Sequence, residues 1–150
     1  MNRQEDYSDL SVRDYRKGDF DQIAAVWEIT EIGGHQRGDT EKTVEESLHL
    51  GGRMLVMESR TTGRICGTSW MTFDGRRTHL HHFGILPAYQ GKGLAKLLLK
   101  ESLRHISEKG YQVKLEVQTS NFKAINLYRK AGFEHLGDYQ VFIIRNVANL

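Results

Sequence analysis

The chain has 150 residues, of which 39% are hydrophobic and 27% are charged. This length is typical of one soluble domain, so we expect a single domain over residues 1–150. The chain has no run of 18 apolar residues and its polar start, 1–9, has no apolar core, so we expect neither a membrane span nor a signal peptide. The single cysteine, Cys66, cannot form a disulfide within the chain, and we expect a reducing, cytoplasmic setting.

The net charge of +2 combines two halves of opposite sign. Residues 1–75 carry 9 Lys and Arg against 14 Asp and Glu, whereas residues 76–150 carry 12 against 5. Two interpretations remain open at this point. The halves bind two ligands of opposite charge, or they are two solvated faces.

The first half predicts a strand, two helices and a hairpin. Alternating apolar residues indicate a strand over 10–15. Asp19 then stands at the cap position of one helix, and Thr40 stands at that of a second, shorter helix. Two β-like runs, 54–58 and 65–72, are joined by a hairpin turn.

The second half alternates strands and helices. We expect a strand at 78–85, a helix at 91–109, a strand at 113–117, a helix at 121–131 and one or two final strands within 133–144. The resulting order, β-α-α-β-β-β-α-β-α-β-β, predicts an α/β fold in which helices pack against a sheet.

A glycine-rich turn follows the strand at 78–85 and opens the next helix. Glycines let successive N–H groups point toward one place, and a helix N-terminus adds partial positive charge, so the turn is suited to phosphate. It is not a P-loop, because Lys92 is followed by Gly93, and it is not a dinucleotide fingerprint, because Lys96 takes the place of the last glycine. The alternative is a helix start whose glycines allow close packing.

The segment 83–95 resembles the acyl-CoA-binding motif of the GNAT N-acetyltransferases. That motif is a strand and a proline followed by Arg/Gln-x-x-Gly-x-Gly/Ala, and Gln90, Gly93 and Ala95 fill its defining places. Residues 115–133 are similar to the second signature of the family, especially in its RimI-type ribosomal-protein alanine acetyltransferases.

The resemblance implies a GNAT fold and acetyl-CoA as co-substrate. The fold has a mixed, mostly antiparallel sheet with helices on both faces and a splayed pair of strands at the CoA site. In such a site Ile85 would bond the pantetheine arm, and residues 90–95 would hold the pyrophosphate. The residues implied to bind the co-substrate are Phe83, Gly84, Ile85, Gln90, Gly91, Lys92, Gly93, Leu94, Ala95 and Asn121.

Two residues are candidates for catalysis. The resemblance places a general base at Glu116, although alternation within 113–117 puts its side chain on the face opposite the apolar residues, where a solvated role is usual. It places a general acid at Tyr128, a residue type that on a helix commonly packs in the core. His81 is a rival base, because family members often place a base on this strand.

Histidines and lysines elsewhere give weaker signals. His79 and His81 share a strand face, but with no third ligand nearby we expect no metal site. A basic stripe recurs every four residues from Lys92 to Arg104 and is typical of a solvated helix face. Because no aromatic residues are interleaved with it, we expect no nucleic-acid partner.

We therefore expect an enzyme that transfers an acetyl group from acetyl-CoA to a primary amine by direct attack. The RimI-like segment makes a protein N-terminus the leading acceptor, with a small amine or polyamine as the alternative. A non-catalytic acyl-CoA-binding regulatory module is a further alternative. A monomer and a homodimer are both compatible with the sequence.

Overall fold

The computed structural model describes residues 7–150, in two compact units, Met1–Glu116 and Val117–Leu150, which are described separately below. The polar start that predicts the absence of a signal peptide falls largely on residues 1–6, outside the described residues. Among the residues described, no helix has the length and apolar character needed to cross a bilayer.

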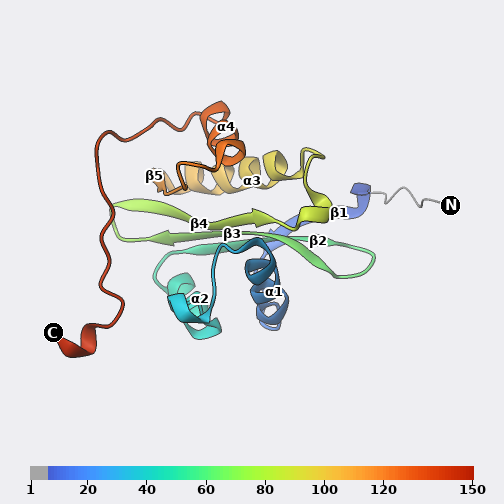
Figure 1. Cartoon of the computed structure of the whole chain (residues 1–150). Helices are drawn as coiled ribbons and strands as arrows, with labels where there is room; N and C mark the ends of the chain where they lie inside the picture. The colour runs from blue at the N-terminus through green and yellow to red at the C-terminus, as the bar shows by residue number, and fades with distance from the viewer. Residues whose placement is uncertain (1–6) are drawn as a thin grey trace. The chain divides into compact units, whose positions relative to one another are not determined.

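The first unit, over its described residues, is a five-stranded sheet with three α-helices. The strand order is β1-β2-β3-β4-β5, and only the last pair is parallel (Figure 1). The elements are β1 (Leu10–Asp14), α1 (Phe20–Thr30), α2 (Glu41–His49), β2 (Arg53–Ser59), β3 (Ile65–Phe73), β4 (Arg77–Ile85), α3 (Leu94–Lys109) and β5 (Gln112–Leu115).

Helices cover both faces of this sheet. Figure 1 shows α1 and α2 on one face and α3 on the other. The central strand β3 is therefore buried continuously from Ile65 to Met71, as expected for a strand covered on both sides. Trp27 of α1 and Leu98 of α3 are fully buried in the two layers. The expected mixed sheet with helices on both faces is confirmed.

The two predicted helix caps differ in what their side chains do. Thr40 caps α2 as predicted, because its Oγ1 accepts a hydrogen bond from the Thr43 amide at 3.2 Å. Asp19 also stands at the cap position of α1, but its carboxylate does not cap the helix. It accepts hydrogen bonds from the Arg13 guanidinium at 2.8 Å and from the Arg16 amide at 2.7 Å instead.

Cys66 lies in β3 and is fully buried. Burial raises the pKa of its thiol to about 11, so the side chain stays protonated at neutral pH. Cys66 is therefore a small core residue.

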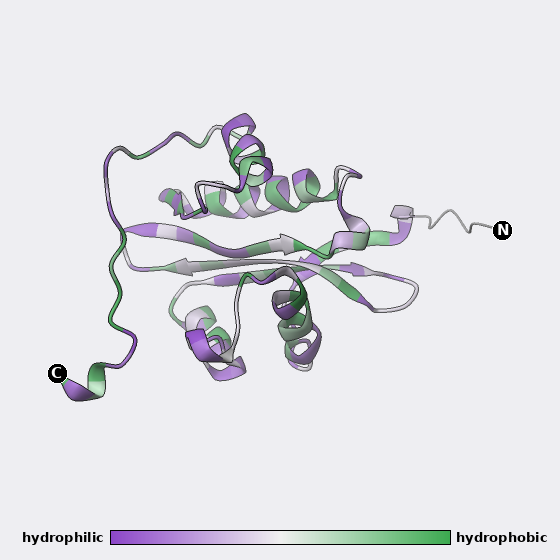
Figure 2. Cartoon of the chain, viewed as in Figure 1, coloured by the Kyte–Doolittle hydropathy of each residue, from purple (hydrophilic) through white to green (hydrophobic). Residues whose placement is uncertain are grey.

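The second unit contains α4 (Phe122–Lys130), and Asn121 caps this helix by accepting a bond from the Ala124 amide at 3.2 Å. The prediction of strands within 133–144 is wrong: no part of this described segment is helix or strand. It carries a hydrophobic run, the green stretch before the C-terminus in Figure 2, in which Phe142 is 86% exposed. An apolar run forms a strand only where a neighbouring strand pairs its backbone, so hydrophobicity alone misled the prediction.

Candidate active site

The strands β4 and β5 are joined along only part of their length. Their registered pairs run from Arg77 with Gln112 to Leu80 with Leu115, where β5 ends. Strand β4 continues to Ile85, still paired with β3 on its other side. The last five residues of β4 therefore have no partner in β5.

Strand β4 has a bulge just beyond its last pair with β5. Thr68 pairs with Gly84 and Trp70 pairs with His81, so two residues of β4, His82 and Phe83, face a single residue of β3. His82 has a φ of 42°, in the left-handed region that residues other than glycine seldom adopt. The bulge directly precedes Gly84 and Ile85, the predicted pantetheine contacts.

The turn after β4 has the glycines that the sequence singled out. Gly91 and Gly93 both have a φ of 77°, and a Cβ built on either would meet no described atom within 4 Å beyond its neighbours in the chain. Close packing therefore does not explain these glycines, whereas the left-handed backbone does. Helix α3 begins at Leu94, so its first N–H groups, which have no partner within the helix, lie at the end of this turn.

Side chains fix the shape of the turn. Gln90 Nε2 donates to the Ile85 carbonyl oxygen at 2.9 Å and so ties the turn to the end of β4. Tyr7, which the sequence reading did not single out, donates from its hydroxyl to the Ala88 carbonyl at 3.3 Å. The Lys92 ammonium lies 4.9 Å from the centroid of the Tyr7 ring. The turn therefore presents a cation beside its two left-handed glycines.

Three histidines, His79, His81 and His82, lie on β4. The rings of His79 and His81 are stacked with centroids 5.0 Å apart, and His81 Nε2 lies 2.7 Å from Thr72 Oγ1. Burial, with the neighbouring charges of His79 and His82, lowers the pKa of His81 to about 4. His81 is therefore neutral at neutral pH. Across the residues described, no group of three or more side chains is arranged to hold a metal ion.

The two predicted catalytic residues lie in different units. Glu116 is exposed and follows the last residue of β5, so the prediction that it lies within a strand is wrong by one residue. Tyr128 is a buried residue of α4 whose ring meets Phe133 edge-on at 5.7 Å. Burial raises the pKa of Tyr128 to about 12. Asn121, the predicted co-substrate contact of the second unit, is the cap of α4.

A comparison with protein families shows to which family the chain belongs. The family model described as "Acetyltransferase (GNAT) family" matches residues 19–133, most of the chain, including the glycine turn and both candidate catalytic residues. The chain belongs to the GNAT acetyltransferase family. As a GNAT acetyltransferase it takes its acetyl group from acetyl-CoA, as the resemblance implied.

Solved structures share the fold of this GNAT acetyltransferase. An acetyltransferase from Trypanosoma brucei has a TM-score of 0.72 at 23% identity over 91% of this chain and 100% of that one. The ribosomal-protein-S18-alanine N-acetyltransferase of Escherichia coli has 0.70 at 20% identity over 83% and 77%. A GNAT acetyltransferase of Elizabethkingia anophelis with acetyl-CoA bound has 0.61 at 16% identity over 85% and 77%. These likenesses confirm the predicted fold class.

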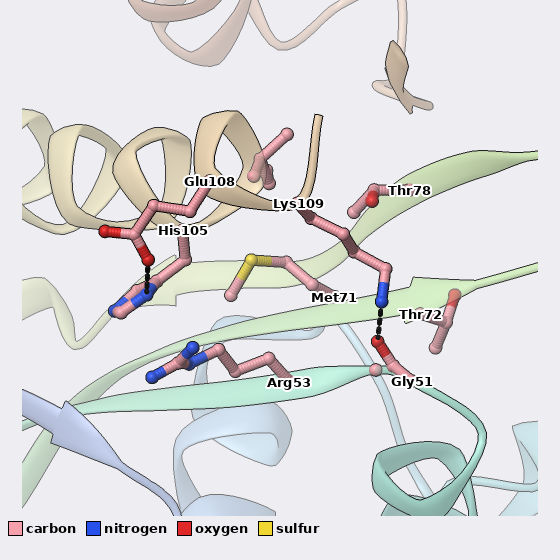
Figure 3. Close-up of a pocket in the computed structure, with 10 residues that line it drawn as sticks. Gly51, Arg53, Met71, Thr72, Thr78, His105, Glu108 and Lys109 are labelled. Atoms are coloured by element: carbon pink, nitrogen blue, oxygen red, sulfur yellow. Dashed lines mark hydrogen bonds and ion pairs between the residues drawn. The ribbon is translucent and has the colours of Figure 1, made fainter. Parts of the chain in front are cut away.

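A pocket of about 300 Å³ lies away from the glycine turn, beside the C-terminal end of α3 (Figure 3). Its wall includes His105 and Lys109 of α3 and Thr72 of β3, and none of the predicted site residues lines it. Lys109 donates to the Gly51 carbonyl at 3.0 Å, the dashed bond at the right of Figure 3. The other two charged side chains of the pocket, Arg53 and Glu108, pair with Asp14 and Arg104.

Proposed function

We propose that this GNAT acetyltransferase acetylates a primary amine and binds acetyl-CoA at the end of β4 and at the glycine turn. The observation that carries the proposal is the pair of left-handed glycines with open space around them, directly before the start of α3. Backbone N–H groups after Gln90, in residues 91–95, would bind the CoA pyrophosphate there. Residues 83–85 would bind the pantetheine arm, and Asn121 would contact it or the diphosphate.

The reaction we propose is a direct transfer. The amine nitrogen attacks the thioester carbonyl carbon, the new C–N bond forms, and the C–S bond breaks to release CoA. Glu116 takes the proton that the attacking amine loses, directly or through water. Tyr128 gives a proton to the departing thiolate, and a backbone N–H near Gly84 and Ile85 stabilises the carbonyl oxygen.

The acceptor we propose is a protein N-terminus. Support comes from the RimI-like residues 115–121 and from the shared fold of the Escherichia coli alanine N-acetyltransferase. An amine arrives as a cation, and α1, α2 and the chain between them carry exposed carboxylates that would attract it. Among them are Glu28, Glu31, Glu41 and Glu46. A small amine or polyamine is the alternative acceptor, because the same charges would attract it.

An acceptor screen tests this function. Free thiol released from acetyl-CoA would be followed with peptides that have a free α-amine, with the same peptides N-acetylated, and with small amines and polyamines. We expect saturable release only with the free peptides, with the acetyl group on the α-nitrogen by mass spectrometry. Release with polyamines alone would overturn the peptide acceptor. Tight acetyl-CoA binding without release by any amine would instead indicate a regulatory module.

A further inference from the structure

We propose that His82 and Asp39 form a latch that positions the β4 bulge for acetyl transfer by tying it to the loop between α1 and α2. His82 Nε2 lies 2.9 Å from Asp39 Oδ2, across 43 residues of sequence. Both side chains are largely buried, with 15% and 9% of their surfaces exposed. The proposal rests on the proposed function, because the bulge leads directly into residues 83–85.

The backbone at His82 needs an anchor. Among the described residues other than glycine, only His82 and Glu31 have a positive φ, and Glu31 has it at the end of a helix, where this conformation is common. A left-handed residue inside a strand is unfavourable, so it persists only where surrounding contacts hold it. The contacts of His82 should therefore determine whether the bulge keeps its shape.

Two buried groups hold the backbone and the ring of His82. Its carbonyl oxygen accepts a bond from Thr68 Oγ1 at 2.8 Å, and that hydroxyl accepts one from Trp27 Nε1 at 2.9 Å. The indoles of Trp27 and Trp70 stack on each other at 5.6 Å, and the His82 ring packs against both, with centroids 4.6 Å and 5.0 Å away. Asp39 completes this set, because it provides the charged partner of the ring.

Asp39 also shapes the loop from which it comes. Its Oδ2 accepts a bond from the Gly34 amide at 2.9 Å, so one carboxylate oxygen holds both the loop and the histidine. Gly33 passes so close that a Cβ on it would lie 2.6 Å from His82 Nε2. A Cβ on Gly84 would lie 2.8 Å from Ile32 Cδ1, which shows a second close approach of the loop to β4.

The geometry assigns His82 a positioning role and not that of a base. Its Nε2 faces Asp39, and its Nδ1 is buried with no hydrogen-bond partner among the described residues. Neither nitrogen is presented to a substrate. The latch instead links two parts of the proposed site. One is the loop between α1 and α2, the region whose carboxylates would attract the acceptor, and the other is β4, whose end would bind the pantetheine arm. Loss of the latch should lower kcat while the pyrophosphate turn, residues 90–95, keeps its affinity for CoA.

The variants His82→Asn and Asp39→Asn test the latch. Asparagine tolerates a positive φ but is too short to replace the imidazole, and Asp39→Asn keeps the shape while removing the charge. We expect each to lower kcat at least tenfold per CoA-binding molecule, with the Kd of CoA changed less than threefold. The double variant should be no slower than the worse single one, because the pair acts as a unit. His105→Asn is the matched control: it removes a largely buried histidine that faces Glu108 near the C-terminal end of α3, and we expect unchanged kcat.

Hydrogen exchange supplies a second readout on the same proteins. We expect residues 31–40 and 81–85 to exchange faster together in Asp39→Asn. Unchanged kcat per CoA-binding molecule, or loosening of the loop without β4, would overturn the latch. If the wild-type protein transfers no acetyl group, but both segments still exchange faster together in Asp39→Asn, the proposed function is wrong and the latch is supported.

Discussion

Gln90 Nε2 donates a hydrogen bond to the carbonyl oxygen of Ile85 at 2.9 Å, and this bond closes the turn between β4 and α3. The Gln90 amide is also occupied, because it donates to the Pro87 carbonyl at 3.2 Å. Gln90 therefore acts on the shape of the turn, and the open N–H groups lie after it.

Gln90→Ala should weaken acetyl-CoA binding. A typical hydrogen bond contributes about 0.5–1.5 kcal/mol, so we expect the Kd to rise by about two- to tenfold, measured by calorimetry. Gln112→Ala is the control, since it removes a comparable side-chain bond with Arg77 at the other end of the sheet. Equal effects of the two variants on the Kd would argue against a role of the turn.

Gly93→Ala should reduce both stability and co-substrate affinity. Its φ of 77° makes alanine unfavourable by about 1–2 kcal/mol, and relaxing that strain would turn the first N–H groups of α3 away. Gly110→Ala is a matched control at the other end of the same helix, with a φ of 86° and open space around it. We expect similar losses of unfolding free energy, but a weaker Kd for acetyl-CoA only in Gly93→Ala. A weaker Kd in both would indicate a general effect of α3.

Glu116→Gln should remove a general base. We expect kcat/KM to fall by about 10²–10⁴, with the loss of the limb of its pH profile that reports the base. Glu134→Gln removes another exposed carboxylate and should leave both unchanged. If Glu116→Gln keeps the wild-type rate and pH profile, Glu116 is not the base.

Tyr128→Phe should lower kcat by about 10²–10⁴ and leave the Kd of acetyl-CoA nearly intact, because a phenol that donates its proton acts only in the chemical step. Burial raises the pKa of Tyr128 to about 12, so the wild-type hydroxyl should cause no loss of kcat between about pH 7 and 10. Tyr111→Phe, at a half-exposed tyrosine, is the control. If the melting temperature of Tyr128→Phe falls so far that unfolding explains its lower rate, Tyr128 serves in packing and not as the acid.

The Arg13 ion pairs should make stability depend on acid pH. A hydrogen bond from Arg13 lowers the pKa of Glu58. Burial alone raises the pKa of Asp19, but its bonds from Arg13 and the Arg16 amide outweigh burial and lower it. A carboxylate with a lowered pKa stabilises the fold above its unfolded pKa, about 4, and loses that contribution as the pH falls through its folded pKa.

Arg13→Met should therefore cost about 3 kcal/mol of unfolding free energy at pH 7, since it leaves two largely buried carboxylates without their partner. The difference from wild type should shrink below about pH 4 in urea titrations. Arg53→Met breaks the ion pair with Asp14, in which both side chains are about half exposed. It should lower the free energy of unfolding by only about 0–1 kcal/mol. Equal costs for the two variants would contradict this account.

Most of the fold could be predicted from local patterns. The hairpin of β2 and β3, the helix ending at Gly110 and the cap at Thr40 all follow from periodicity and from residues that favour one conformation. The segment 133–144 could not, because a strand depends on a partner that local hydrophobicity does not specify. For the same reason the end of β5 before Glu116 was not predictable.

In the candidate site, too, features set by local sequence could be predicted and features set by distant residues could not. The glycine turn was predictable, because Gly91 and Gly93 supply a conformation that few other residues adopt. The pair of His82 and Asp39 was not, since its partners are 43 residues apart and no short motif joins them. The contact of Tyr7 with Ala88 spans 81 residues and left no local signal either.

The burial of Cys66 has a practical consequence for measuring this enzyme. Thiol-specific dyes react with thiolates, and the only cysteine of the chain is fully buried with a pKa of about 11. In native protein such a dye should report released CoA with no background from the enzyme itself. In denaturant the same dye should label one site per chain, which gives a direct count of unfolded molecules in every variant preparation.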